Sequence, residues 1–212
     1  MIYLIFIFHF AAIPLQDLRV AEELNGRVTV EAEHYYRQRA DSLRRWQTIT
    51  VEENPSLAGA GGDAWLQLLP DTRITHEDPL IHGQNFSNTP GAMAILDYLI
   101  HFNTPGRYYV WVRAWSEGSE DNGLHVGLEG LWPQSGSRMQ WCEGKHTWTW
   151  ASRQRTESEH CGEERLIYLD IQNTGLQRVS FSMREDGFRF DKFSLSLDYA
   201  PPVDTDSANG SN

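Results

Sequence analysis

From residue 27 onward, hydrophobic and polar residues alternate in short runs that are separated by Gly, Pro, Asn and Asp. No long stretch follows the period of an α-helix, and short alternating runs are typical of β-strands. Turn sequences such as NTPG and QNTG join several of the runs as hairpins. The pattern predicts an all-β fold in which two antiparallel sheets pack face to face. The predicted strands are residues 27–34, 45–51, 62–69, 94–102, 106–115, 123–130, 146–152, 165–171, 176–183 and 188–197.

The chain divides into three parts, with a folded domain predicted for residues 27–198. Residues 1–26 begin with the apolar run MIYLIFIFHFAAIPLQ, which has the length of a signal-peptide core but no basic start and no clear cleavage site. Three interpretations remain open: a secretion signal, a start codon assigned inside a longer protein, or a segment packed on the domain. We favour export, and therefore an extracellular or periplasmic location. Residues 199–212 are rich in Pro, Asp and Ser and predict a linker or a disordered end.

Composition and charge narrow the function classes. The formal net charge is −11, which argues against nucleic-acid binding because a phosphate-binding surface needs clustered Lys and Arg. The chain has eight Trp, eight Tyr and nine Phe residues, a content that suits both a core and stacking on flat ligands. Cys142 and Cys161 can close one loop if they pair in an oxidising compartment, and the sequence leaves open whether they do.

Acidic residues near the two ends of the predicted domain form a candidate metal site. In the first predicted strand, Glu31 and Glu33 lie on the face opposite Val28, so their carboxylates are close to each other. In the last strand Asp191 falls on the same face as Phe193, and a buried carboxylate must be hydrogen-bonded, paired or bound to a metal. The residues alone leave three alternatives: calcium, a salt bridge to Arg, or a backbone cap.

Four segments carry a resemblance to a known family: VTVEAEHY, GRYYVWVRAWSEGSEDNGLHVGLEG, TWTW and REDGFRFDKFSLS, in this order. Together they resemble the β-jelly-roll carbohydrate-binding modules of families 6 and 35, and especially the related modules at the ends of family 115 glycoside hydrolases and in agarase-like proteins. The resemblance covers residues 27–197 and implies a β-jelly-roll sandwich. It also implies a structural calcium held by Glu31, Glu33 and Asp191.

A carbohydrate-binding module implies aromatic side chains that stack on a sugar and polar side chains that hydrogen-bond its hydroxyls. The candidates are Tyr36, Asn122 and Trp141, with Trp148 added although its spacing from Trp150 is more typical of core packing. Asn122 also fits an ordinary turn, because EDNG is a turn sequence. A disulfide between the two cysteines would brace the loop that carries Trp141. The segment 68–91 has no clear counterpart in smaller modules of this type.

The sequence contains no zinc motif H-E-x-x-H and no nucleophile elbow G-x-S-x-G. Glu31 and Glu33 lie on one strand, so they do not face each other across a groove as the carboxylates of a glycosidase do. We therefore expect a non-catalytic module that binds a plant- or algal-type polysaccharide and accompanies a polysaccharide-active enzyme such as a glycoside hydrolase. We expect a monomer without a nucleic-acid or membrane partner. The alternatives are a structural or protein-interaction sandwich and, after that, a jelly-roll polysaccharide lyase.

Overall fold

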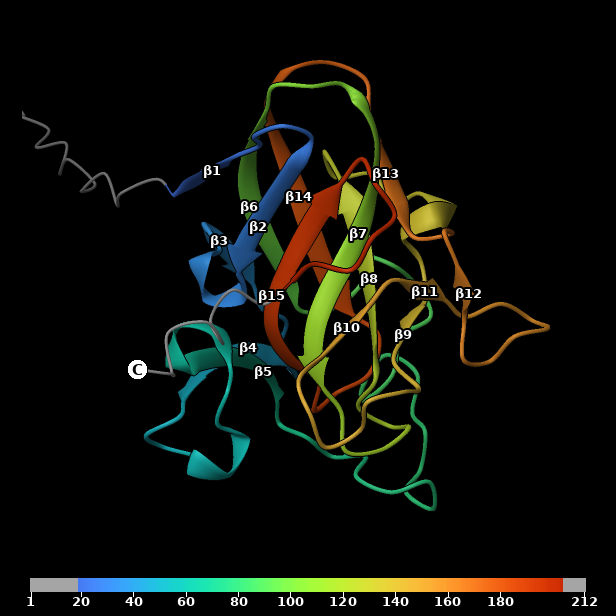
Figure 1. Cartoon of the computed structure of the whole chain (residues 1–212). Helices are drawn as coiled ribbons and strands as arrows, with labels where there is room; N and C mark the ends of the chain where they lie inside the picture. The colour runs from blue at the N-terminus through green and yellow to red at the C-terminus, as the bar shows by residue number, and fades with distance from the viewer. Residues whose placement is uncertain (1–18, 204–212) are drawn as a thin grey trace, which may run out of the picture.

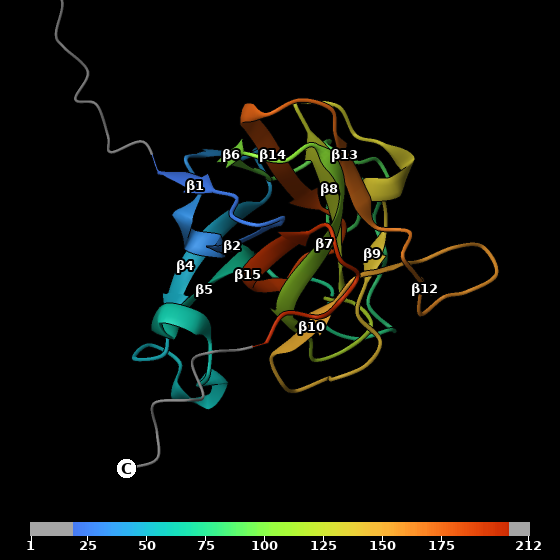
Figure 2. The same ribbon diagram turned by 45° about the horizontal axis from the view of Figure 1, so that its top comes forward.

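The computed structural model describes residues 19–203, which form β-strands and short 3₁₀ helices. The apolar run before residue 19 and the tail after residue 203 lie outside the described residues. Two sheets pack face to face, and all strand pairs are antiparallel except β1 with β6. Figures 1 and 2 show the two layers, with β7 and β15 in one and β6, β8 and β14 in the other. The all-β sandwich that the sequence predicts is confirmed. Among residues 19–203, no helix is long and apolar enough to cross a membrane.

Sheet A has eight strands, in the order β1-β6-β14-β8-β9-β11-β12 with β3 beside β6. Their bounds are β1 Val20–Glu22, β3 Arg37–Arg39, β6 Ile95–Phe102, β8 Gly123–Leu128, β9 Met139–Gln140, β11 Arg153–Gln154, β12 Glu163–Glu164 and β14 Gly175–Met183.

Sheet B has seven strands, in the order β10-β7-β15-β5-β4, with β13 beside β7 and β2 beside β15. Their bounds are β2 Arg27–Glu31, β4 Arg45–Thr50, β5 Ala64–Leu69, β7 Gly106–Trp115, β10 Thr149–Ala151, β13 Tyr168–Ile171 and β15 Arg189–Ser196. Four 3₁₀ helices lie between strands: η1 Ala32–His34, η2 Pro55–Leu57, η3 Gly61–Asp63 and η4 Gln134–Gly136.

The main hydrophobic core fills the space between the sheets. Tyr98 and Phe181 both lie within 5 Å, centroid to centroid, of the ring of Phe193, at 4.8 and 4.9 Å. Strand alternation supplies these inward side chains: on β7, Val110 and Val112 face the core and are fully buried. The opposite face of β7 carries aromatic side chains, as its sequence pattern predicts.

A second, smaller apolar cluster covers part of the outer face of sheet B. Leu57, Ala60, Trp65 and Trp148 are buried together there, under the chain that connects β4 to β5. The Trp148 indole N–H donates to the carbonyl of Leu57 at 3.0 Å, and its ring lies 5.6 Å from that of Trp65. The connection between β4 and β5, which contains η2 and η3, therefore packs on the outer face of sheet B. Trp65 and Trp148, which point away from the main core, hold it there.

The long segment between β5 and β6 packs along the turn that joins β14 to β15. Ser87 donates its backbone N–H to the carbonyl of Arg184 at 2.7 Å, and Asp186 donates its own to the carbonyl of Asn85 at 3.1 Å. Asn85, Ser87 and Asp186 are all buried. The segment thus fills this end of the sandwich.

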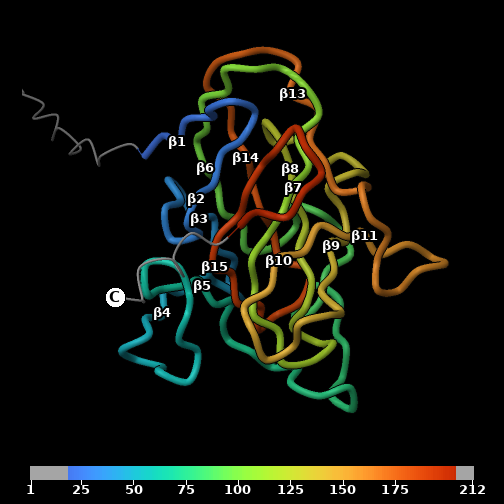
Figure 3. Tube along the Cα trace, in the orientation of Figure 1, coloured from blue at the N-terminus to red at the C-terminus, as the bar shows by residue number. Residues whose placement is uncertain are grey.

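The folded part extends beyond both predicted domain boundaries. β1 pairs in parallel with β6 although it lies before residue 27, and the carboxylate of buried Glu23 accepts backbone hydrogen bonds from Asn103 and Thr104, both at 2.8 Å. At the other end the chain after β15 folds back across sheet B (Figure 3). Its Tyr199 packs against Tyr109, with 5.1 Å between ring centroids.

Candidate functional site

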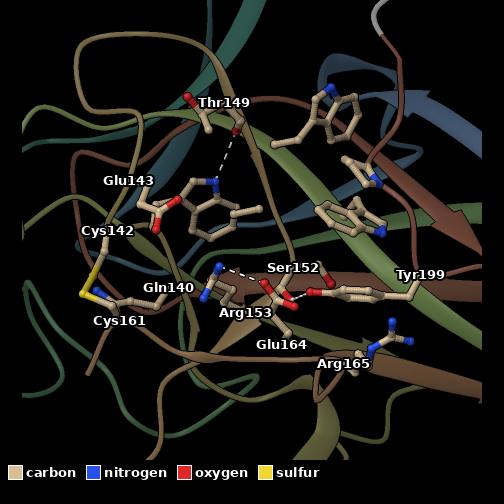
Figure 4. A pocket seen from close by; sticks show the side chains of 15 residues that line it. Gln140, Cys142, Glu143, Thr149, Ser152, Arg153, Cys161, Glu164, Arg165 and Tyr199 are labelled. Atoms are coloured by element: carbon tan, nitrogen blue, oxygen red, sulfur yellow. Dashed lines mark hydrogen bonds and ion pairs between the residues drawn. A yellow bond between two sulfur atoms is a disulfide. The ribbon is translucent and has the colours of Figure 1, made fainter. Parts of the chain in front are cut away.

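A pocket of about 460 Å³ lies between the region of β10 to β12 and the chain that follows β15 (Figure 4). Three segments distant in the sequence build it: outward residues of β7, the loops tied together by the cysteines, and the segment after β15. Its lining residues are Trp111, Gln140, Trp141, Cys142, Glu143, Thr149, Trp150, Ala151, Ser152, Arg153, Cys161, Glu164, Arg165, Tyr199 and Pro201.

Aromatic rings form one side of this pocket. Trp111 points outward from β7 because its neighbours Val110 and Val112 point into the core. The ring of Tyr199 lies 5.0 Å from that of Trp111, and its hydroxyl donates to the carbonyl of Ser152 at 3.2 Å. Burial raises the pKa of Tyr199 above its ordinary value, so the hydroxyl remains protonated and able to donate.

A disulfide closes the opposite end of the pocket. Cys142 and Cys161 are bonded, with 5.3 Å between their Cα atoms. The bond joins the loop before β10 to the loop between β11 and β12, and both cysteines line the pocket. A cross-link between two loops restricts their independent motion, so this wall is held in place.

Charged groups lie at defined positions around the pocket. Arg153 and Glu164 face each other across the β11–β12 pair and form an ion pair at 2.8 Å. The guanidinium of Arg165 lies 4.7 Å from the ring centroid of Tyr199. Figure 4 shows Arg165 and Tyr199 at one end and Glu143 beside the disulfide at the other. Indole and phenol faces next to hydroxyl, amide and charged groups suit a ligand with both an apolar face and many hydroxyls.

Two of the predicted sugar contacts have structural roles. Asn122 is 1% exposed and donates its side-chain N–H to the carbonyl of Trp141 at 2.6 Å, while its side-chain carbonyl accepts from Gln140. Trp141 is 2% exposed and packs edge-on against Phe188 at 5.1 Å. Trp141 does line the pocket, whereas Asn122 does not and is buried. The four residues of the EDNG sequence, 120–123, are all buried.

The other two predicted contacts lie away from this pocket. Trp148 belongs to the outer apolar cluster, so its core-packing alternative describes its position. Tyr36 precedes β3 in sheet A, where its backbone N–H donates to the carbonyl of Asp97 at 3.0 Å and the guanidinium of Arg37 lies 5.5 Å from its ring. Neither residue lines the pocket.

Sequence analysis names none of the pocket residues Trp111, Trp150, Arg165 and Tyr199 as a candidate contact. The sequence pattern assigns Tyr199 to the tail, because Pro, Asp and Ser are frequent in residues 199–212. The signal that was available lies on β7: outward aromatics at Tyr109 and Trp111 need a covering group, and the nearest aromatic beyond the last strand is Tyr199.

The predicted metal residues lie close together, but the geometry differs from the prediction. β2 ends at Glu31, and Glu33 is in η1 rather than two positions along the same strand. The pairing of β15 with β7 shifts at an irregularity between Phe190 and Lys192, which places Asp191 with outward-facing Arg113 instead of inward Phe193. The predicted face of Asp191 is therefore wrong, although its burial is complete.

Asp191 is satisfied by groups from the chain. Its carboxylate accepts from the backbone N–H of Gly61 at 2.6 Å and is paired with Arg113, which also donates to the carbonyl of Gly59. Nearby, Lys192 Nζ lies 3.6 Å from Glu31 Oε1. The salt bridge and the backbone cap that the sequence left open are thus both present at Asp191.

Glu33 has a different environment. Its Oε2 atom is buried and has no hydrogen-bond partner in the described part of the chain. Burial, together with the carboxylates of Glu31 and Asp191, raises the pKa of Glu33 to about 7. Gly61 and Gly62 pack against the two glutamates, where a side chain on Gly61 would collide with Glu31. Across residues 19–203, no group of three His, Cys, Asp or Glu side chains is arranged as a metal site. Asp191 is thus satisfied by Gly61 and Arg113, whereas Glu33 keeps one buried oxygen without a hydrogen-bond partner among residues 19–203.

Among curated proteins, the chain is 53% identical over 194 residues to an uncharacterized protein of Formosa agariphila. The alignment covers 86% of this chain and 47% of that protein, so the chain spans about half the length of the curated relative it matches. No protein-family model matches the chain.

Solved structures of carbohydrate-binding modules from families 35 and 6 are similar to the chain. A family 35 module from Clostridium thermocellum has a TM-score of 0.47 and 11% identity, covering 80% of this chain and 96% of that one. The C-terminal family 6 module of a laminarinase from Zobellia galactanivorans has a TM-score of 0.43 and 14% identity, covering 80% and 98%. These are the two families that the sequence motifs resemble. With TM-scores below 0.5, these likenesses carry no argument about this chain.

Proposed function

We propose that this domain is a non-catalytic carbohydrate-binding module that holds a plant- or algal-type polysaccharide in the pocket beside β10. The observation that carries the proposal is the pocket itself, in which Trp111, Trp150 and Tyr199 stand next to polar groups of the disulfide-linked loops. A pyranose ring has an apolar face that packs on aromatic rings and a rim of hydroxyls that needs hydrogen-bond partners. The pocket offers both.

The charged groups of the pocket favour binding over hydrolysis. Glycoside hydrolysis needs two carboxylates on opposite sides of the scissile bond, one of them available as a base or nucleophile. Glu164 is paired with Arg153 at 2.8 Å, and Glu143 is exposed beside the disulfide. The lining therefore supplies recognition groups rather than an acid and base pair. If such a module is linked to an enzyme, it would keep that enzyme next to insoluble glycan and raise the local concentration of the enzyme.

The test is calorimetric titration of the full chain with soluble xylan, mannan, laminarin, agarose oligosaccharides and pectin. Tyr199→Ala removes one wall of the pocket, and Tyr36→Ala is the matched control because Tyr36 is an aromatic residue outside it. Binding to at least one glycan that weakens in Tyr199→Ala and persists in Tyr36→Ala supports the proposal. Binding that depends on Tyr36 instead, or no binding to any glycan, contradicts it.

A structural calcium is the second part of the proposal. The buried Oε2 of Glu33, which has no hydrogen-bond partner in residues 19–203, is the observation that supports it, with Glu31 as the adjacent donor. Calcium takes carboxylate and backbone oxygens, and here it would join the start of sheet B to the η3 loop. We expect the thermal midpoint to fall on chelation in the wild type and to be insensitive to chelation in Glu33→Gln. An equal midpoint with and without chelator in the wild type contradicts this part.

One observation favours the alternative, a sandwich that binds another protein. Residues 85–87 pack on the turn between β14 and β15 and occupy the loop end of the sandwich, which in the resembling modules is one of the two places for a ligand. The pocket beside β10 is separate from that end and remains lined by aromatic rings. The glycan titration above distinguishes the two functions, because a protein-binding sandwich gives no signal with any polysaccharide.

The disulfide between Cys142 and Cys161 supports a location outside the cytoplasm, where such bonds persist. We propose an extracellular or periplasmic protein, consistent with an insoluble glycan as the target.

A further inference from the structure

Arg165 differs from the other arginine at the pocket in lacking an acidic partner. Arg153 is neutralised by Glu164 at 2.8 Å, whereas Arg165 forms no ion pair with any acidic side chain of residues 19–203. Its side chain is exposed, and its guanidinium lies over the Tyr199 ring at 4.7 Å. An arginine stacked on an aromatic ring keeps the N–H groups at its edge available to a ligand.

The backbone of Arg165 is in an uncommon conformation. Its φ is +64°, in the left-handed region that long side chains rarely adopt. Arg165 lines the pocket directly after the Glu164 end of β12, with its guanidinium near the Tyr199 ring.

The pocket is therefore electrically polarised. The Arg153–Glu164 pair is neutral, Glu143 lies at the disulfide end, and Arg165 lies at the Tyr199 end (Figure 4). The chain as a whole carries a net charge of −11, so an accessible cation at a binding site stands out from its surroundings. A negatively charged group on a ligand has one favourable position here, beside Arg165.

We propose that the pocket selects a sugar bearing an anionic substituent, a carboxylate or a sulfate ester, which Arg165 binds while the ring stacks beside Tyr199. This inference rests on the proposed carbohydrate-binding function and adds the chemical class of the ligand. The planar guanidinium matches two oxygens of either group with parallel N–H donors. Carboxylate and sulfate groups both accept such a pair of hydrogen bonds, and the experiment below distinguishes them.

The test uses the full chain and four polymers: polygalacturonate with its carboxyl-reduced form, and ι-carrageenan with its desulfated form. Arg165→Gly removes the guanidinium while suiting the left-handed backbone, so folding is retained. Arg45→Ala is the control, because Arg45 is an exposed arginine on β4, away from the pocket. Arg165→Lys keeps the charge and loses the two-pronged geometry.

We expect at least one acidic polymer to bind about tenfold more tightly than its neutral form, the gain typical of hydrogen bonds to a charged group. Arg165→Gly should abolish this preference, Arg165→Lys should reduce it, and Arg45→Ala should leave it intact. The preferred polymer then tells carboxylate from sulfate. Equal binding of neutral and acidic forms, or a preference that survives Arg165→Gly, overturns the inference and leaves carbohydrate binding standing. No binding by these polymers or by any glycan of the earlier panel overturns both.

Discussion

The ring of Tyr199 covers the ring of Trp111, with 5.0 Å between their centroids and 40° between their planes. One residue lies in the middle of β7, and the other follows the last strand of the domain. Trp111 is only 7% exposed, because Tyr199 packs on its ring. Tyr199 also lines the pocket, so the segment after β15 forms part of the pocket wall. Under the proposed function, a bound glycan would contact Tyr199 and Pro201 of this segment.

The first prediction separates the ring of Tyr199 from its hydroxyl. Tyr199→Phe keeps the ring against Trp111 and loses one hydrogen bond to Ser152, so we expect glycan affinity within about threefold of wild type. Tyr199→Ala removes the stacking surface, and we expect a loss of about tenfold. Calorimetry measures both. Equal losses in the two variants would show that the hydroxyl, and not the ring, contacts the sugar.

The second prediction concerns the disulfide. Replacing Cys142 and Cys161 by Ser opens a link between residues 19 apart in sequence, and the expected cost is about 3 kcal/mol of unfolding free energy. Since the link also holds the pocket wall, glycan affinity should fall in the folded variant. Urea denaturation and calorimetry check the two effects. A variant with wild-type affinity would mean that the loops keep their positions without the bond.

The third prediction concerns pH and Asp71. Burial, with the nearby carboxylates of Asp186 and Asp121, raises the pKa of Asp71 to about 6. The folded state therefore retains a proton that the unfolded state releases near pH 4, so this residue lowers stability as the pH rises from about 4 to 6. Asp71→Asn should have a higher thermal midpoint than wild type at pH 8, with a smaller difference at pH 4. A difference independent of pH would refute this explanation.

The fourth prediction concerns the ion pair beneath η3. Arg113→Met leaves Asp191 buried without its cationic partner, and we expect a loss of about 3–5 kcal/mol in unfolding free energy. The double variant Arg113→Met with Asp191→Leu removes both charges and should recover part of that loss. Denaturant unfolding measures the cycle. No recovery in the double variant would show that packing, rather than the unpaired charge, sets the cost.

The fifth prediction concerns Asn122. Asn122→Ala leaves the carbonyl of Trp141 and the amide of Gln140 without their partner, at a cost of about 2 kcal/mol. Because Asn122 is 1% exposed, glycan affinity per folded molecule should not change. Urea denaturation and a titration corrected for the folded fraction provide the comparison. Reduced affinity at unchanged stability would restore Asn122 as a sugar contact.

The two-sheet sandwich could be predicted from the sequence, because the alternation of inward and outward side chains depends only on neighbouring residues in each strand. On β7, Val110 and Val112 face the core and Trp111 faces outward, as the pleat requires. Asp191 shows where that reasoning fails, since an irregularity in β15 shifts the register by one position and turns the side chain to the other face. The pattern of β15 alone contains no signal for that shift.

The pocket was harder to predict because its residues meet only through tertiary contacts. Trp150 and Trp111 lie on β10 and β7, Tyr199 arrives from beyond the last strand, and Arg165 reaches the rim through an unusual backbone angle. The sequence left open the pairing of Cys142 with Cys161, a bond that is present in the fold. It placed the contacts at loop residues such as Asn122, which the fold uses for internal hydrogen bonds.

The most direct test of the proposed sugar site is the set of indole N–H signals of the eight tryptophans in a heteronuclear NMR spectrum, recorded during titration with the glycan panel. Binding in the pocket beside β10 should shift the signals of Trp111 and Trp150 and leave that of Trp46, in the main core, unchanged. Shifts confined to other tryptophans, or an unchanged spectrum with every glycan, would contradict the assignment of this pocket as a carbohydrate-binding site.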